Sequence, residues 1–227
     1  MTSVSNIAGA WRALCHDPVG VLWPAAAMLS LQAVGALALQ RILHSGRLDA
    51  LLTVFLATSL IRILLGAPLR ARMLKAGARS MGLDTNDRWI ALLGVHLIVG
   101  PLQLGLATGS VILGTGIAAG IAAHGLPTLA TLAWFLGWLG GTLAALVIRA
   151  IFAYAPLEVL LRGCSAIQAL RRSAIRGPVD TLAAALLVGF GDLAVLLGAL
   201  TCGAGALPGY PISDLALLDR WRRGRTS

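Results

Sequence analysis

The chain has 227 residues, of which 58% are hydrophobic and 12% are charged, and its net charge is +9. A soluble domain carries about 25% charged residues, so this composition excludes an ordinary soluble domain. The basic residues stand in short clusters between apolar runs, which indicates loops beside anionic lipid and argues against nucleic acid as a partner.

Residues 3–16 precede the first long apolar run. Ile7, Trp11 and Leu14 recur at spacings of four and three, so they would form one apolar stripe on a helix. We expect this helix to lie in the membrane interface, with Trp11 at the level of the headgroups. Pro18 would end it before the membrane.

The first predicted hairpin covers residues 19–68. Its two apolar runs, at about 19–40 and 49–68, each have the length of about 20 residues that a membrane span needs. The next segment, 69–88, is strongly basic and is therefore expected on the cytoplasmic side, against anionic headgroups. Its candidate headgroup-binding residues are Arg70, Arg72, Lys75 and Arg79.

The second predicted hairpin covers residues 89–157. No Asp, Glu, Lys or Arg occurs in residues 89–148, and the segment 124–127 contains the glycine and proline of a turn. The first arm would then have about 33 residues and measure about 50 Å as one helix, more than a hydrocarbon core of about 30 Å. We expect this arm to tilt, protrude or kink at Pro101.

Residues 158–178 form a second basic segment, predicted to be one amphipathic helix on the cytoplasmic side. Arg171, Arg172 and Arg176 are its candidate headgroup-binding residues. Glu158 and Arg162 stand four residues apart, a spacing that predicts a surface ion pair.

A third hairpin is predicted over residues 179–218, followed by a basic tail at 219–227. One span in this region would place the four arginines of the tail outside, against the positive-inside rule, whereas two spans near 180–196 and 198–215 return the tail to the cytoplasm. We favour six spans in total, with five as the alternative. A proline followed by Leu or Ile ends each hairpin at 68, 156 and 211; this is either an internal repeat or chance in a Leu-rich chain.

The predicted fold class is therefore all-α. Residues 1–227 would form a single integral membrane domain, a polytopic transmembrane helical bundle of three hairpins with interfacial amphipathic helices. The N-terminus, residues 69–88, residues 158–178 and the C-terminus are expected on one side of the membrane.

Small residues recur at helical spacing in the uncharged region. Glycines four residues apart let helix backbones approach closely, either within one subunit or between copies of the chain. These helix-packing candidates are Gly105, Gly109, Gly116, Gly120, Gly137 and Gly141.

Three polar residues stand inside the predicted spans. Arg62 and Asp192 would each cost about 3 kcal/mol at the centre of a lipid-exposed helix, so they should face the protein interior or water. They would either pair with each other or line a polar path, and His96 is a further candidate for that path. Arg149, near the end of its span, is expected to extend toward the interface.

The sequence contains no motif for catalysis, metal binding or cofactor binding. The histidines are scattered, and Cys15, Cys164 and Cys202 lack the spacing of metal ligands. We therefore predict no catalytic residue, no metal site and no cofactor, and a protein that is not an enzyme.

The order of parts resembles the bacterial membrane proteins of the glycerophosphodiester-phosphodiesterase membrane-domain type. The resemblance is carried by residues 10–12 ahead of residues 17–18, by residues 156–158 and 165–173, and by the Gly-rich last span followed by residues 215–221. It covers nearly the whole chain, but the tail has Trp221 near a point where relatives more often have tyrosine. It implies a multi-pass protein of the bacterial cytoplasmic (inner) membrane, without the soluble phosphodiesterase domain and without an established chemistry.

Three functions remain open from the sequence. The first is a non-enzymatic scaffold or accessory subunit that packs against other membrane subunits or against copies of itself. The second is a component of a transporter or channel, with Arg62 and Asp192 on its polar path. The third and weakest is an intramembrane enzyme acting on lipid. The positions of Arg62 and Asp192 discriminate between the first two, since a dry pair favours the scaffold and a wet cavity favours transport.

Overall fold

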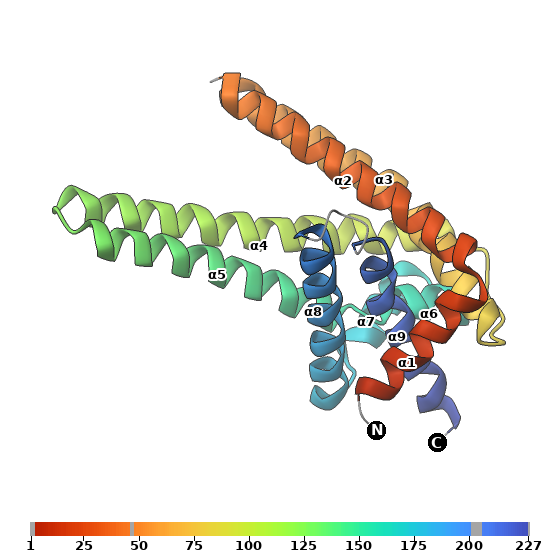
Figure 1. Cartoon of the computed structure of the whole chain (residues 1–227). Coiled ribbons are helices and arrows are strands. Elements are labelled where there is room, and N and C mark those ends of the chain that lie inside the picture. Colours follow the sequence, from red (N-terminus) through yellow and green to blue (C-terminus); the bar gives the residue numbers. More distant parts are fainter. Residues whose placement is uncertain (1–2, 46–47, 201–205, 227) are drawn as a thin grey trace.

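The computed structural model describes residues 3–45, 48–200 and 206–226, and this part of the chain is all helical. Figure 1 shows the arrangement of the helices. Their bounds are α1 Ser3–His16, α2 Pro18–Ser45, α3 Leu48–Ser80, α4 Trp89–Ala123, α5 Pro127–Ile151, α6 Ala155–Arg162, α7 Ala166–Ala174, α8 Pro178–Leu200 and α9 Ala206–Thr226.

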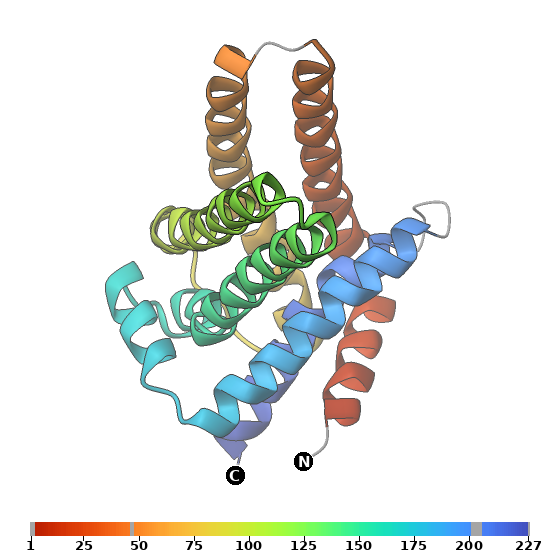
Figure 2. The ribbon, with the colours of Figure 1, turned by 90° about the vertical axis from the view of Figure 1, so that its left-hand side faces the viewer.

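The long helices pair in chain order. Helices α2 and α3, α4 and α5, and α8 and α9 make the most extensive contacts in the molecule. Figures 1 and 2 show that the first two hairpins extend in different directions from a common base, where α1, α6 and α7 lie. Helix α1 packs against α9, so the first and last helices meet at this base.

Prolines mark where several helices begin. Helices α2, α5 and α8 start at Pro18, Pro127 and Pro178, where the missing N–H of proline costs no intrahelical hydrogen bond. Asp17 caps α2, since its carboxylate accepts a hydrogen bond of 2.9 Å from the backbone N–H of Gly20. The predicted breaks near residues 17–18 and 124–127 therefore coincide with helix boundaries.

Four helical segments are long and apolar enough to cross a membrane, judged by their length and composition. Within the residues searched, α3 and α9 are not among these segments. Large apolar side chains such as Ile112, Leu113 and Trp138 point outward from α4 and α5, as lipid contact requires. The four segments are Pro18–Ile42, Trp89–Ala123, Pro127–Arg162 and Pro178–Val195.

Three helices differ in their bounds from the sequence prediction. Helix α3 continues through Pro68, the expected end of the first hairpin, to Ser80. Helix α2 continues to Ser45, beyond the expected end of the first span near residue 40, and residues 46–47 of the expected turn lie outside the described residues. Helix α8 continues to Leu200, past the expected boundary near residues 196–198, and residues 201–205 lie outside the described residues.

The basic segment after α5 forms two short helices instead of one. Helix α6 ends at Gly163, whose φ of 65° lies in the left-handed region that terminates helices. Ser165 then caps α7 together with Gln168, each side chain accepting a hydrogen bond from the backbone N–H of the other. A helix stop and a new helix start therefore stand only two residues apart, which a single amphipathic helix could not accommodate.

The buried core lies at the base and not along the hairpin arms. Fully buried side chains from α3, α4, α6, α8 and α9 meet there, and they include Met73, Leu92, Leu160, Leu187 and Leu218. Helix α1 contributes Leu14 to this core, while Trp11 on the same helix stays exposed. The predicted apolar stripe of α1 is therefore divided between the protein core and the surface.

Glycines allow α4 and α5 to cross at close range. A Cβ atom built on Gly137 would stand 2.5 Å from the Cα of Gly114, and one on Gly141 would stand 2.8 Å from the backbone oxygen of Ala107. Hydrogen is the only side chain that fits at such a crossing. A Cβ on any of four other glycines would meet nothing within 4 Å, and these are Gly105, Gly109, Gly116 and Gly120.

We expect Gly137→Ala to lower the free energy of unfolding by about 2 kcal/mol, because the added methyl group must push apart two backbones. Gly116→Ala is the matched control, since its methyl group enters open space and alanine favours the helix. The comparison can be made by unfolding both variants in dodecyl maltoside with increasing sodium dodecyl sulfate. Equal stability of the two variants would contradict the close crossing.

Candidate functional site

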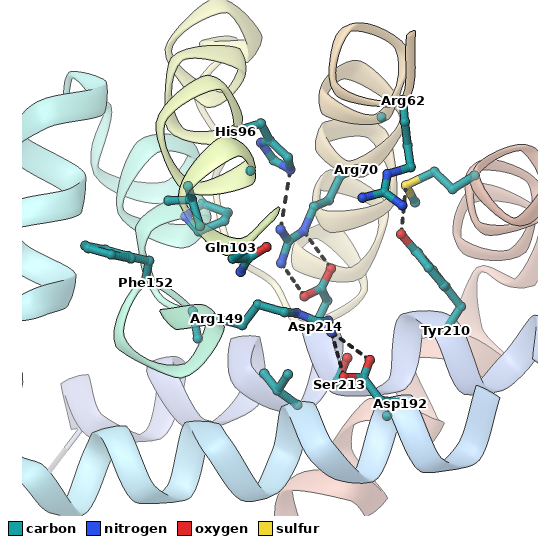
Figure 3. Close-up of a pocket in the computed structure, with 18 of the residues that line it drawn as sticks. Arg62, Arg70, His96, Gln103, Arg149, Phe152, Asp192, Tyr210, Ser213 and Asp214 are labelled. Carbon is teal, nitrogen blue, oxygen red and sulfur yellow. Dashed lines mark hydrogen bonds and ion pairs between the residues drawn. The ribbon is translucent and has the colours of Figure 1, made fainter. Parts of the chain in front are cut away.

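A cavity of about 420 Å³ lies where the three hairpins meet at the base. Its wall is built by residues of α2, α3, α4, α5, α8 and α9, so no single hairpin contains the site. Figure 3 shows the polar groups that it labels converging from α3, α4, α5, α8 and α9. The charged and polar lining residues are Gln32, Arg62, Arg70, His96, Gln103, Arg149, Asp192, Tyr210, Ser213 and Asp214.

Helical spacing directs these groups toward the cavity. Arg62 and Arg70 stand eight residues apart on α3, and His96 and Gln103 stand seven apart on α4. Both spacings are close to two full turns, so each pair lies on one face of its helix. Gly66 lies between the two arginines on α3 and also lines the cavity, which leaves that face open.

Arg70 and Asp214 form a two-pronged ion pair between α3 and α9. Nε of Arg70 donates to Oδ2 of Asp214 at 2.8 Å, and Nη2 donates to Oδ1 at 2.6 Å. The Arg70 side chain is 25% exposed and that of Asp214 is 12% exposed, so the pair is largely shielded from solvent. This parallel geometry is the strongest arrangement that a guanidinium and a carboxylate adopt.

His96 extends this pair in a defined tautomer. Its Nδ1 lies 2.9 Å from the carbonyl oxygen of Leu92, which can only accept, so Nδ1 carries the proton. Its Nε2 lies 3.4 Å from Nη1 of Arg70, which can only donate, so Nε2 is unprotonated. His96 is therefore a neutral ring, and all three nitrogens of Arg70 have partners.

Asp192 pairs with Arg149 and not with Arg62. Nη1 of Arg149 donates to both carboxylate oxygens of Asp192, at 2.8 and 2.6 Å. The two side chains are 42% and 52% exposed, respectively. Arg149, expected to extend toward the membrane interface, lines the cavity, where this carboxylate from α8 binds its guanidinium.

Arg62 lines the cavity without a carboxylate partner. Within the described part of the chain, no hydrogen bond or ion pair joins its guanidinium to another residue. Figure 3 shows it extending toward the region of Tyr210, whose hydroxyl group donates to the sulfur of Met28 at 3.5 Å. Arg62 and Asp192, considered together in the sequence as a possible pair, thus share a cavity without contacting each other.

Glu158 forms a buried ionic centre, where a surface pair with Arg162 was expected. Its side chain is 1% exposed, and its carboxylate lies 2.8 Å from Arg176, 3.2 Å from Arg162 and 3.7 Å from Arg172. The indole nitrogen of Trp221 also donates to it, at 3.3 Å. The helical spacing to Arg162 was correct, but the burial of Glu158 was missed because it depends on side chains outside this segment, such as Trp221 of α9.

The predicted headgroup-binding residues divide into two groups. Arg72, Arg79 and Arg171 are exposed at the surface. The others contact carboxylates: Lys75 pairs with Asp87 at 2.5 Å, Arg70 with Asp214, and Arg172 and Arg176 with Glu158. Only the first group has its charge free of an acidic partner within the described part of the chain.

The basic tail forms the last turns of α9 and contacts neighbouring helices. Asp219 is buried and pairs with Arg222 at 2.9 Å and Arg223 at 2.6 Å, and Nη2 of Arg223 also donates to the backbone oxygen of Ser5 on α1. Arg220 pairs with Asp180 on α8 at 2.8 Å. Partial burial lowers the pKa of the Arg220 guanidinium, but the hydrogen bonds and charges of Asp180 and Tyr154 together outweigh this, and its pKa is raised overall.

Several lining residues were not identified from the sequence. Gln32 and Gln103 are uncharged amides within apolar runs, and that position was the one signal in the sequence that could have identified them as lining residues. Asp214 and Ser213 could not be recognised, because they stand in a segment of mixed charged and apolar residues, which is typical of a protein surface.

Among the described residues, no group of three His, Cys, Asp or Glu side chains could hold a metal ion.

Comparisons with known proteins give no match: no protein-family model, no curated protein and no solved structure is significantly similar to this chain. The resemblance to the glycerophosphodiester-phosphodiesterase membrane-domain type therefore stays a prediction.

Proposed function

We propose that the chain is a non-enzymatic transport component of the bacterial inner membrane, and that the cavity holds a polar solute. The observation that carries this proposal is the location of Arg62 and Asp192, which line one cavity and do not pair with each other. A volume of about 420 Å³ is within the range of ligand pockets and would hold roughly fourteen waters.

We also propose that the chain crosses the membrane six times, as three hairpins. Helices α3 and α9 would supply the two spans beyond the four apolar segments, with Arg62 facing the cavity and not lipid. The contact between α1 and α9 supports an even number of spans, because it keeps both ends of the chain together. The exposed arginines Arg72, Arg79 and Arg171 would then lie on the cytoplasmic side, against anionic headgroups.

A role as a scaffold or accessory subunit is the second candidate. It is favoured by Gly105, Gly109, Gly116 and Gly120 on α4, where an added Cβ would meet no atom of this chain within 4 Å. Small residues on a lipid-facing helix can receive a helix of another subunit or of a second copy. The two roles are compatible, because these glycines do not line the cavity.

Thiol labelling tests whether the cavity contains water. Cys15, Cys164 and Cys202 are first changed to serine, and a single cysteine is then introduced as Val99→Cys, which lines the cavity, or as Ile98→Cys, which does not. These neighbours on α4 lie at almost the same depth in the membrane. Because the thiolate is the reactive form and needs water to form, a hydrophilic methanethiosulfonate should modify only the cysteine at position 99.

The labelling experiment also has a clear negative outcome. If neither cysteine reacts, the cavity is dry and the proposed transport role is wrong. If both react equally, the position at the cavity has no special access to water, and the proposal fails in the same way.

A further inference from the structure

We propose that the solute is an anion bearing a phosphate group, and that Arg62 and the free edge of Arg149 bind it. This inference rests on the proposed function, because it names the chemical class of the solute held in the same cavity. Two guanidinium groups in the cavity have free donors: that of Arg62 on α3 and that of Arg149 on α5. Both carboxylates of the cavity, Asp192 and Asp214, already pair with an arginine.

The charges of the cavity favour an anion. Three arginines face two aspartates there, and each aspartate already has an arginine partner. His96 adds no charge, because its hydrogen bonds with Leu92 and Arg70 define it as the neutral ring. One positive charge is thus in excess, and it stands on a helix that we place in the membrane, where an unpaired charge is costly.

The free hydrogen-bond donors define the kind of anion. Each of the three guanidinium nitrogens of Arg70 already contacts Asp214 or His96, so Arg70 has few free donors for a ligand. Arg149 uses only Nη1, which leaves Nε and Nη2 available, and Arg62 has its whole guanidinium available within the described part of the chain. Two guanidinium groups on different helices suit a tetrahedral anion, because its oxygens point in several directions at once.

The rest of the wall leaves room for more than a phosphate ion. Gln32 and Gln103 offer amides, and Ser213 offers a hydroxyl group, which are suitable partners for the hydroxyl groups of a phosphate ester. Apolar residues such as Leu31 and Ile63 complete the lining. Both a lipid headgroup and a free phosphate carry the chemistry that the arginines would recognise, and the experiment must separate them.

The first measurement uses the Val99→Cys protein and two thiol reagents of opposite charge. Sulfonatoethyl methanethiosulfonate should react about tenfold faster than its trimethylammonium counterpart, after correction for their rates with a free thiol, because of the excess positive charge. Arg62→Gln should reduce this ratio to about one. Arg72→Gln, which removes an exposed charge from the same helix, should leave the ratio unchanged.

The second measurement is protection of the same cysteine, and it does not depend on the folding of an Arg62 variant. Inorganic phosphate, dihexanoyl phosphatidylglycerol and dihexanoyl glycerol are added separately before labelling. Protection by the phospholipid alone identifies a lipid headgroup as the solute. Protection by inorganic phosphate, with or without protection by the phospholipid, shows that the phosphate group is recognised without the rest of the lipid.

Two outcomes would overturn the inference. Equal protection by dihexanoyl glycerol would show that binding does not depend on phosphate, and no protection by any of the three compounds would show that the cavity does not bind the anion. In both cases the cysteine at position 99 still reacts, so the proposed function stands. If the cysteine at position 99 does not react under any condition, the proposed function is itself wrong.

Discussion

Replacing Glu158 with glutamine should lower the free energy of unfolding by about 3 kcal/mol, because it removes a buried negative charge that pairs with three arginines. The carboxylate is 1% exposed and contacts α6, α7, the segment after α7, and α9 through Arg162, Arg172, Arg176 and Trp221. Glutamine preserves the shape of the side chain, so the loss would report charge and not packing.

Asp87→Asn is the matched control for this prediction. Asp87 also pairs with a basic residue, Lys75, but it is 79% exposed, and such surface pairs contribute less than about 1 kcal/mol. Both variants can be unfolded in mixed dodecyl maltoside and sodium dodecyl sulfate micelles and followed by tryptophan fluorescence. A loss at Glu158 no larger than the loss at Asp87 would mean that the buried ionic centre does not hold the base together.

The ion pair between Arg70 and Asp214 should show a coupling energy of about 3 kcal/mol in a double-mutant cycle. The cycle compares Arg70→Gln, Asp214→Asn and the double variant, and it isolates the interaction between the two side chains. A large value is expected because the pair is two-pronged, shielded from solvent and joined to His96.

The second ion pair of the cavity provides the internal comparison. Arg149 and Asp192 are about half exposed and use a single nitrogen of the guanidinium, so their coupling should be about 1 kcal/mol or less. The expected order would be reversed if Arg149 and Asp192 formed the structural pair and Arg70 and Asp214 were free to open. In that case Arg70, and not Arg149, would have the free hydrogen-bond donors for the anion.

The sequence predicted much of the fold because membrane helices obey simple length and composition rules. The uncharged residues 89–148 predicted two adjacent spans, and the structure places α4 and α5 there with the turn between Ala123 and Pro127. Six spans remain a proposal, since four segments meet the criterion of length and apolarity. The division into α6 and α7 was missed, because a single glycine in the left-handed region ended the helix.

The candidate site was predictable only in part. Arg62, Asp192 and His96 could be singled out because a polar side chain inside an apolar span needs a protein or water environment. Arg70 was assigned to headgroup binding and Glu158 to the surface, since their segments mix charged and apolar residues. Their actual partners, Asp214 and Trp221, stand more than sixty residues away, and no periodicity within a segment reports such contacts.

The amino-acid sequence by itself predicted a helical membrane protein, the position of its uncharged hairpin and the charges that needed an explanation. These properties follow from transfer free energy, which acts on each segment separately. Only the tertiary structure decided which arginine pairs with which aspartate, that Glu158 is buried, and that Arg62 has no carboxylate partner among the described residues. Pairing depends on which helix faces meet at the base, and that arrangement is a property of the three hairpins together.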